Sequence, residues 1–209
     1  MSPYIVPFGI YIALSLVAGC FETGAYVMYP LKTLLVAVSL WYYRREYTEL
    51  RGRVTPGQLV PAVLIGLAVF VIWILPEGKY PQLGASEFNP FVVQNGALRQ
   101  VLIGFRLAGA ALVVPLFEEL FWRSFLIRWI VDQEFKTVPI GRFTWMSFGL
   151  TVVFFGLEHH RWLVGLAAGA IYNGLLYQQK KLWPCVLAHG VTNLALGIYV
   201  LCTAQWSFW

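Results

Sequence analysis

Charged residues are scarce in this 209-residue sequence. Asp, Glu, Lys and Arg together make up 12%, about half of their usual share in soluble domains, whereas hydrophobic residues make up 59%. The mean hydropathy of +0.67 is that of a polytopic membrane protein. No linker rich in Ser, Gly or Pro, no internal repeat and no low-complexity tract divides the chain. We therefore predict an all-α transmembrane helix bundle in which residues 1–209 form one domain.

Residues that several protease classes require are also missing. An aspartyl protease needs two aspartates, and the chain has only Asp132, which lies in a predicted loop. The zinc motif HExxH is absent, because residues 158–160 (Glu-His-His) have the wrong order and spacing. No GxSG-like serine occurs, and Ser124 has no evident histidine partner. These absences argue against the aspartyl, HExxH-type and serine mechanisms.

Cysteine is rare as well. The three cysteines lie in apolar runs without CxxC spacing, so we expect them to be small buried hydrophobic residues. Residues 17–20 (Val-Ala-Gly-Cys) are similar to a bacterial lipoprotein cleavage site. No Lys or Arg precedes them to form the basic region of a signal peptide, which disfavours that interpretation. The cysteines are Cys20, Cys185 and Cys202.

Apolar runs dominate what is present. Several are shorter than the usual twenty residues of a membrane span, which tilt or neighbouring helices can accommodate. We predict about seven spans. The runs cover residues 4–20, 25–43, 59–75, 107–130, 143–157, 163–177 and 183–201.

Basic residues predict the orientation in the membrane. They gather in three loops that lie on one side if the spans alternate, and the positive-inside rule makes that side cytoplasmic. The N-terminus is then cytoplasmic and the C-terminus outside, and the net charge of +5 reflects topology rather than nucleic-acid binding. The basic loop residues are Arg44, Arg45, Arg51, Arg53, Arg128, Lys136, Arg142, Lys180 and Lys181. Glu22, Glu77, Lys79 and Glu87 lie in the opposite loops.

Three charged residues interrupt the fourth apolar run. From Leu107 to Glu118 the helical rise gives roughly 17 Å, which places the carboxylates near the middle of the bilayer. Charge at that depth is unfavourable, so the default interpretation is a site that faces a polar cavity. Glu119 and Arg123 share a helix face and can pair; a purely structural buried ion pair is the alternative. Pro115 is expected to kink this helix and free backbone carbonyls near the carboxylates.

Smaller features complete the predicted layout. Residues 97–106 have the pattern of a short helix that lies in the membrane interface. Lys32 is interpreted as a snorkelling lysine, and Trp206 and Trp209 as interfacial anchors. A small-residue face that permits close helix packing is predicted in the sixth run, at Gly165, Gly169 and Asn173.

All three histidines occur in late membrane segments, and two of them suggest a shared polar pocket. Each of His159 and His189, taken alone, suits a hydrogen bond between helices. Together with Asn193, four residues after His189 on the same face, and with the two glutamates, they indicate one site. Zinc ligation remains an open alternative, because carboxylate and imidazole groups both bind zinc. Its candidate ligands are Glu118, Glu119, His159 and His189.

Taken in order, three patterns resemble a known family. Residues 118–123 read EExxxR, residues 155–159 read FxxxH and residues 189–193 read HxxxN. This set is similar to the CPBP family of intramembrane glutamate proteases, which includes the CAAX prenyl endopeptidase and the bacteriocin-processing and abortive-infection proteins. The resemblance covers about residues 107–201, the expected catalytic core. The short length also looks similar to a bacterial CAAX protease-related branch associated with exosortase systems.

The resemblance implies hydrolysis without a metal or other cofactor. Glu118 with His159 would hold and deprotonate a water that attacks the scissile carbonyl. His189 and Asn193 would donate hydrogen bonds to the oxyanion. The residues that brace this site would be Glu119 and Arg123.

The resemblance also sets expectations for partners and location. The substrate would be a membrane-associated peptide or protein, cut near a membrane face, and the protein would lie in the bacterial inner membrane. A non-catalytic immunity, partner-stabilising or transport protein that uses the same pocket for binding is the alternative. His160 and Glu158 flank His159, and the spacing from Phe155 favours His159 as the site residue. His159 and His189 are expected to converge only if the fifth helix continues to about residue 163.

Overall fold

The computed structural model describes residues 1–21, 23–52, 54–84 and 88–209. In these ranges the regular structure is entirely helical, with seven helical segments, which confirms the predicted fold class. Three charged residues that we assigned to loops on either side of the membrane lie outside the described residues: Glu22, Arg53 and Glu87.

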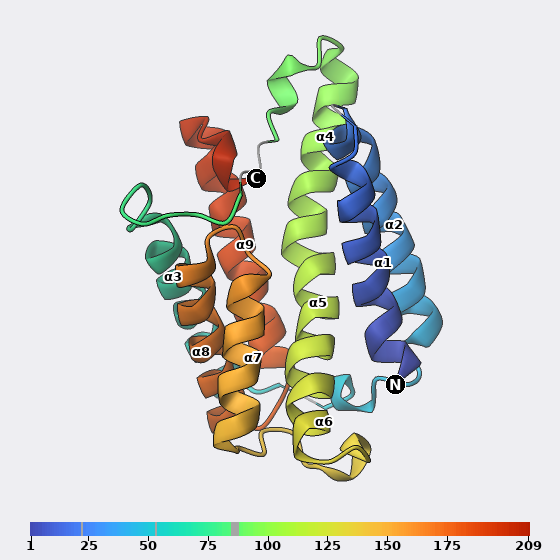
Figure 1. Ribbon diagram of the computed structural model, residues 1–209, viewed down its shortest axis with the longest axis vertical. Coiled ribbons are helices and arrows are strands. Elements are labelled where there is room, and N and C mark those ends of the chain that lie inside the picture. The colour runs from blue at the N-terminus through green and yellow to red at the C-terminus, as the bar shows by residue number, and fades with distance from the viewer. Residues whose placement is uncertain (22, 53, 85–87) are drawn as a thin grey trace.

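The helices pack in pairs around one long central helix (Figure 1). Helix α1 runs along α2, α3 along α9 and α7 along α8. The bounds are α1 (Ser2–Ala18), α2 (Gly24–Tyr43), α3 (Pro56–Ile74), α4 (Gly96–Ala108), α5 (Val114–Glu119), α6 (Ile127–Val131), α7 (Trp145–Leu157), α8 (Trp162–Gln179) and α9 (Trp183–Thr203). Short 3₁₀ turns cover Thr48–Leu50, Pro90–Val92, Phe135–Thr137 and Trp206–Phe208.

The central helix runs without a break over Gly96–Val131 and comprises α4, α5, α6 and the turns between them. Its 36 residues correspond to about 54 Å, more than the thickness of the hydrocarbon core. The segment that we predicted as a short interfacial helix is helical, but it continues directly into the span (Figure 1). The apolar face of α4 therefore extends the central helix instead of forming a separate element.

Two π-helical turns, Gly109–Val113 and Leu120–Leu126, flank the six-residue helix α5. Such turns insert an extra residue into the helical repeat and often mark functional sites. Pro115 lies directly after the first of them and has no N–H to donate. The wide turn thus takes the place of the predicted kink just before the two glutamates.

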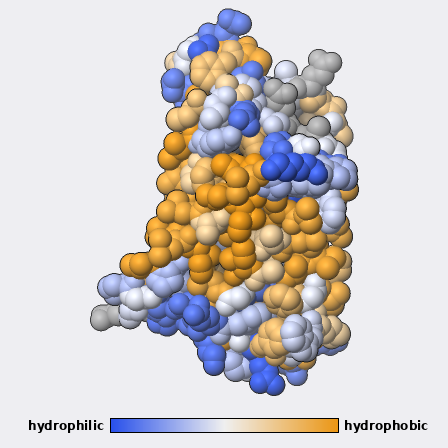
Figure 2. Space-filling model, turned by 90° about the vertical axis from the view of Figure 1, so that its left-hand side faces the viewer, coloured by the Kyte–Doolittle hydropathy of each residue, from blue (hydrophilic) through white to orange (hydrophobic). Residues whose placement is uncertain are grey.

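On the face shown in Figure 2, an apolar belt lies between two polar ends. Many large apolar side chains of the described residues are exposed, among them Leu64, Leu112, Met146 and Ile198. So large an apolar surface suits acyl chains rather than water. Four helices in the described residues are long and apolar enough to cross a membrane, and α1 and α7 are shorter apolar helices. The chain is an integral membrane protein, and the number of seven crossings stays a prediction.

The predicted basic loops meet at one end of the bundle (Figure 1). Lys136, in the turn after α6, pairs with Glu46 after α2 at 3.4 Å. The indole of Trp183, at the start of α9, donates to the carbonyl of Leu50 at 2.7 Å. These contacts join all three loops and confirm that they share one end.

The long connection after α3 docks on the turn between α7 and α8 at the other end. The N–H of Leu83 donates to the carbonyl of His160 at 2.8 Å. Arg161 donates from Nε and Nη2 to the carboxylate of Glu77, at 2.8 and 2.6 Å, and from Nη1 to the carbonyl of Ser207 at 2.8 Å. These hydrogen bonds from Arg161 lower the pKa of the Glu77 carboxyl below its ordinary value. One arginine thus links the connection to the C-terminal turn.

The C-terminal turn differs from the predicted membrane anchor. Trp209 is only 5% exposed and packs its ring against Phe88, at 6.1 Å between centroids. The guanidinium of Arg106 lies 6.0 Å from the centre of the Trp209 ring. Trp209 is therefore buried inside the protein.

Candidate active site

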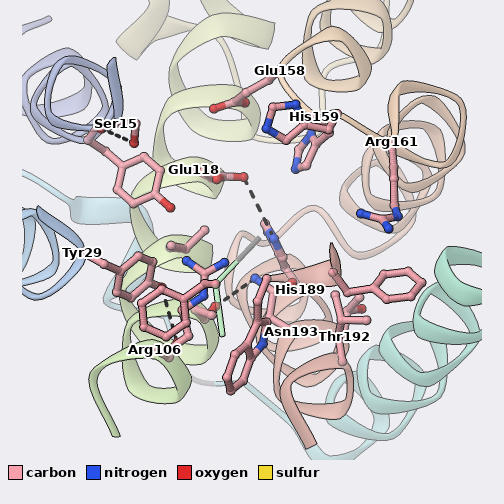
Figure 3. A pocket seen from close by; sticks show the side chains of 18 of the residues that line it. Ser15, Tyr29, Arg106, Glu118, Glu158, His159, Arg161, His189, Thr192 and Asn193 are labelled. Carbon is pink, nitrogen blue, oxygen red and sulfur yellow. Dashed lines mark hydrogen bonds and ion pairs between the residues drawn. The ribbon is translucent and has the colours of Figure 1, made fainter. Parts of the chain in front are cut away.

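One cavity of about 590 Å³ collects the predicted catalytic residues. Glu118 reaches it from α5, His159 from the turn after α7, and His189 and Asn193 from α9. Figure 3 shows these side chains pointing into the same space. The structure therefore brings together residues that lie up to 75 positions apart in the sequence.

The ion pair predicted between Glu119 and Arg123 is present. Arg123 Nη1 lies 3.3 Å from Glu119 Oε1, and both side chains are almost fully buried, at 1% and 0% exposure. Arg123 Nε donates to Asn173 Oδ1 at 3.2 Å, and Asn173 Nδ2 donates to Thr151 Oγ1 at 2.9 Å. This network connects α5, α7 and α8 behind the cavity and braces the glutamate-bearing segment.

The small-residue face of α8 packs as predicted. A side chain at Gly165 would meet the backbone of Gly156 on α7 at 3.0 Å, and one at Gly169 would meet the ring of Phe155 at 3.2 Å. These glycines let α8 approach α7 closely. The close approach brings Asn173 within reach of Arg123.

Glu119 also orients His189. Its Oε1 lies 2.9 Å from His189 Nδ1. Because an ionised carboxylate can only accept, Nδ1 carries the hydrogen and donates it. The imidazole also stacks on Tyr172, at 5.3 Å between ring centroids. Both contacts fix the ring so that its other nitrogen, Nε2, faces Glu118.

Glu118 keeps an oxygen available for substrate or water. Its Oε2 lies 4.0 Å from His189 Nε2, and no described residue offers that oxygen a hydrogen bond. The side chain is 5% exposed. Leaving a buried acceptor unpaired costs about 1–3 kcal/mol, which is unusual without a functional reason.

His159 reaches the cavity in a different way from the one expected. Helix α7 ends at Leu157, so it does not continue to residue 163. In the closing turn the N–H of His159 donates to the carbonyl of Gly156 at 3.1 Å, which leaves the Phe155 carbonyl for His159 Nδ1 at 2.7 Å. Since a carbonyl only accepts, Nδ1 carries the hydrogen and Nε2 remains an acceptor. The convergence results from an early helix end.

Asn193 is held by the first π-helical turn. Its Nδ2 donates to the carbonyl of Ala110 at 2.8 Å. In that turn the N–H of Val114 donates to the carbonyl of Gly109. The next residue in this pattern is Pro115, which has no N–H to donate to the carbonyl of Ala110. The proline thus frees a backbone carbonyl, as predicted, and the freed carbonyl positions Asn193.

Sequence reasoning missed several residues of the cavity wall. Glu158 lines it and accepts a hydrogen bond from the Trp122 indole at 3.0 Å. Lys32 and Arg106 line it as well, although we placed them at the membrane interface. The sequence held one signal for Lys32: a lysine inside an apolar span is rare, and it usually faces the interior of the bundle or a polar cavity.

The residues proposed as zinc ligands lie near one another. Glu119 nevertheless uses Oε1 for both Arg123 and His189. Among the described residues, no group of three or more His, Cys, Asp or Glu side chains is arranged to hold a metal ion.

The fold and cavity together define a class of protein: a helical membrane protein with carboxylates and imidazoles in an internal polar pocket. Residues 100–195 match the family described as type II CAAX prenyl endopeptidase Rce1-like. This segment contains all three motifs and is similar to the CAAX protease family, which confirms the predicted resemblance. Searches of curated proteins and of solved structures found no significant match.

The match supports a peptide hydrolase of the CAAX-type intramembrane protease kind. The matched range overlaps residues 107–201, where we expect the catalytic core, and it leaves out α1, α2 and α3. Lys32 therefore lies in a part of the cavity that the match does not reach.

Proposed function

We propose that this protein is a metal-independent endopeptidase that uses a glutamate-activated water. The observation that carries the proposal is the meeting of Glu118, His159, His189 and Asn193, from three separate helical segments, around one buried cavity. We propose further that residues 1–209 form a single domain with its catalytic core at 107–201.

The residue chemistry accounts for each step. A water held by Glu118 and the acceptor nitrogen Nε2 of His159 loses a proton to the glutamate and attacks the scissile carbonyl carbon. The carbonyl oxygen becomes an oxyanion, which His189 Nε2, in its protonated form, and Asn193 Nδ2 stabilise. The C–N bond then breaks, and Glu118 returns the proton to the leaving amine. The products are a carboxylic acid and an amine.

Glu119 supports this chemistry through His189. The carboxylate of Glu119 accepts from Nδ1 and fixes the ring, so that Nε2 is directed toward the reacting carbonyl. Arg123 holds that carboxylate in place from the other side. This pair is therefore a positioning device rather than a group that touches substrate.

The cavity extends toward the end opposite the basic loops. Its lining includes Gly19 after α1, Ala25 at the start of α2, Phe88 after α3, and Ser207 and Trp209 after α9. With a cytoplasmic N-terminus and an outside C-terminus in a bacterial inner membrane, as we propose from the positive-inside rule, substrate approaches from the outer face.

The decisive experiment removes only the acidity of Glu118. The Glu118→Gln variant keeps the size of the side chain, so it should insert and fold but lose cleavage. Comparing the C-termini of the membrane proteome between wild type and variant would identify the substrate, because its product terminus disappears. The matched control is Glu46→Gln, a half-exposed carboxylate at the basic end whose loss should change nothing.

Two outcomes would redirect the assignment. Full cleavage by Glu118→Gln would remove the proposed mechanism, and a phenotype that survives this change but fails in Gly165→Leu would favour the non-catalytic alternative. Metal independence has its own measurement: activity should persist after dialysis against strong chelators. Activity that is lost and returns with Zn²⁺ would contradict it.

A further inference from the structure

Two cations on the cavity wall have no carboxylate partner among the described residues. Lys32 of α2 is 8% exposed, and neither it nor Arg106 of α4 takes part in any of the ion pairs found in this part of the chain. The Nε atom of Arg106 is buried and has no hydrogen-bond partner in the described structure. Unpaired charge inside a membrane bundle is unfavourable and marks a binding site by default.

The surroundings of the two cations leave donors available. Lys32 Nζ donates to Ser15 Oγ at 2.7 Å and lies 4.0 Å from the centre of the Tyr11 ring. An ammonium has three donors, and Ser15 takes one of them. Lys32 and Arg106 both lie against the ring of Tyr29, at 5.0 and 4.3 Å from its centre. Tyr29 and Arg106 are seen together on the wall in Figure 3.

Charge is divided across this cavity. Glu118 and Glu158 supply carboxylates beside the two histidines, whereas Lys32 and Arg106 supply positive charge on the wall formed by α2 and α4. A substrate carboxylate placed near Glu118 would be repelled, and one placed between the two cations would be attracted. The distribution therefore orients an anionic peptide in one direction only.

We propose that Lys32 and Arg106 form an anion subsite that binds a carboxylate of the peptide substrate; this deepens the proposed peptidase function and rests on it. Arg106 and Glu118 are twelve positions apart on the central helix, which is about 18 Å along its axis. An extended peptide spans about 3.5 Å per residue. The scissile bond thus lies within about five residues of the bound carboxylate.

Binding without turnover tests the subsite directly. The Glu118→Gln protein in phosphatidylcholine nanodiscs is titrated with fluorescent pentapeptide pools that end in a free carboxylate or in an amide. A charge-assisted contact should make the acid pool bind about 10- to 100-fold more tightly than the amide pool. A third pool, amidated but with a final Asp, separates a terminal carboxylate from a side-chain carboxylate.

Substitution of either cation should abolish this preference. In Lys32→Met and in Arg106→Met, acid and amide pools should bind equally, while Lys32→Arg should retain part of the difference. The matched control is Lys136→Met, which removes an exposed lysine at the basic end and should keep the full preference. Equal binding of the acid and amide pools by the Glu118→Gln protein that retains Lys32 and Arg106 would overturn the proposed subsite. So does displacement of both pools by phosphatidylglycerol, which would indicate a lipid site.

Two further readouts separate the possible failures. Lys32 is a buried charge without a carboxylate partner, so the Lys32→Met variant should unfold at the same temperature as the parent protein or at a higher one. A large loss of stability would show that the lysine has a structural role and would overturn the proposal. Cleavage is measured independently in the protein that retains Glu118. Cleavage with no acid preference refutes the subsite alone, whereas acid preference without cleavage refutes the peptidase alone.

Discussion

In both site histidines Nδ1 donates a hydrogen bond, but the two acceptors differ. A backbone carbonyl holds His159, and a carboxylate holds His189. The carbonyl adds no charge, so Nε2 of His159 stays an acceptor suited to water. The carboxylate of Glu119 holds His189 so that its Nε2 faces Glu118. In the proposed mechanism, His159 would act on the attacking water and His189 on the oxyanion.

Asn193 provides a test of the oxyanion assignment. In Asn193→Ala one donor to the developing charge is lost, so kcat should fall about 10²- to 10³-fold, with little change in KM. Steady-state kinetics on the substrate found from the proteome comparison would measure this. Thr203→Ala is the matched control, because its hydroxyl only bonds to its own helix. An unchanged kcat in Asn193→Ala would show that the oxyanion is stabilised elsewhere.

Single residues were predictable where their chemistry forms a spaced pattern. Glu118, Glu119 and Arg123 follow from charge in an apolar run, and the cavity contains the two histidines that spacing selected. Lys32 was assigned the wrong environment, because a lysine near a span end can snorkel or can point inward with the same sequence. Only the packing of α1 and the central helix around α2 decides whether the side chain of Lys32 snorkels or points inward.

Helix ends and irregular turns were the least predictable elements. The apolar runs located the helices, yet they gave no sign that α4 continues into the span or that α7 stops at Leu157. The end of α7 coincides with a tertiary contact, because the connection after α3 docks on the turn that follows α7, through Leu83 and His160. The π-helical turns have no periodic signature at all, although Pro115 indicated an irregularity.

The docked connection should loosen in acid. Hydrogen bonds from Arg161 lower the pKa of Glu77, so this pair stabilises the docked state fully above the ordinary carboxyl pKa of 4.5. The contribution is lost as pH falls through the lowered value, because the neutral carboxyl no longer attracts the guanidinium. Amide hydrogen exchange at Leu83, which bonds to His160, reports the docking.

The Glu77→Gln variant sets the reference for that measurement. Its Leu83 protection factor should be low at every pH, and wild-type protection should fall toward it only under acid conditions. Glu46→Gln serves as the control, since that carboxylate lies at the opposite end of the bundle. Protection in wild type that is independent of pH would mean that Arg161 and Glu77 do not hold the connection.

At the scale of the whole molecule, the two ends have different tasks. The end that carries the basic loops is tied by contacts such as Lys136 to Glu46, whereas the other end surrounds the cavity with the α1–α2 turn, the connection after α3 and the C-terminal turn. The sequence predicted this polarity from charge alone. It gave no indication of which end the cavity approaches, because that depends on how loops from distant parts of the chain assemble.

The native cysteines allow the orientation to be tested without tags. We expected all three to be buried, but only Cys185 is; Cys20, in the turn after α1, and Cys202, near the end of α9, are exposed at the end away from the basic loops. If the basic end is cytoplasmic, a membrane-impermeant maleimide added to intact spheroplasts should label Cys20 and Cys202. Cys20→Ser combined with Cys202→Ser should lose that label, and in this background a cysteine introduced by Thr137→Cys at the basic end should react only after permeabilisation. Labelling in the reverse order would invert the topology and move substrate entry to the cytoplasmic face.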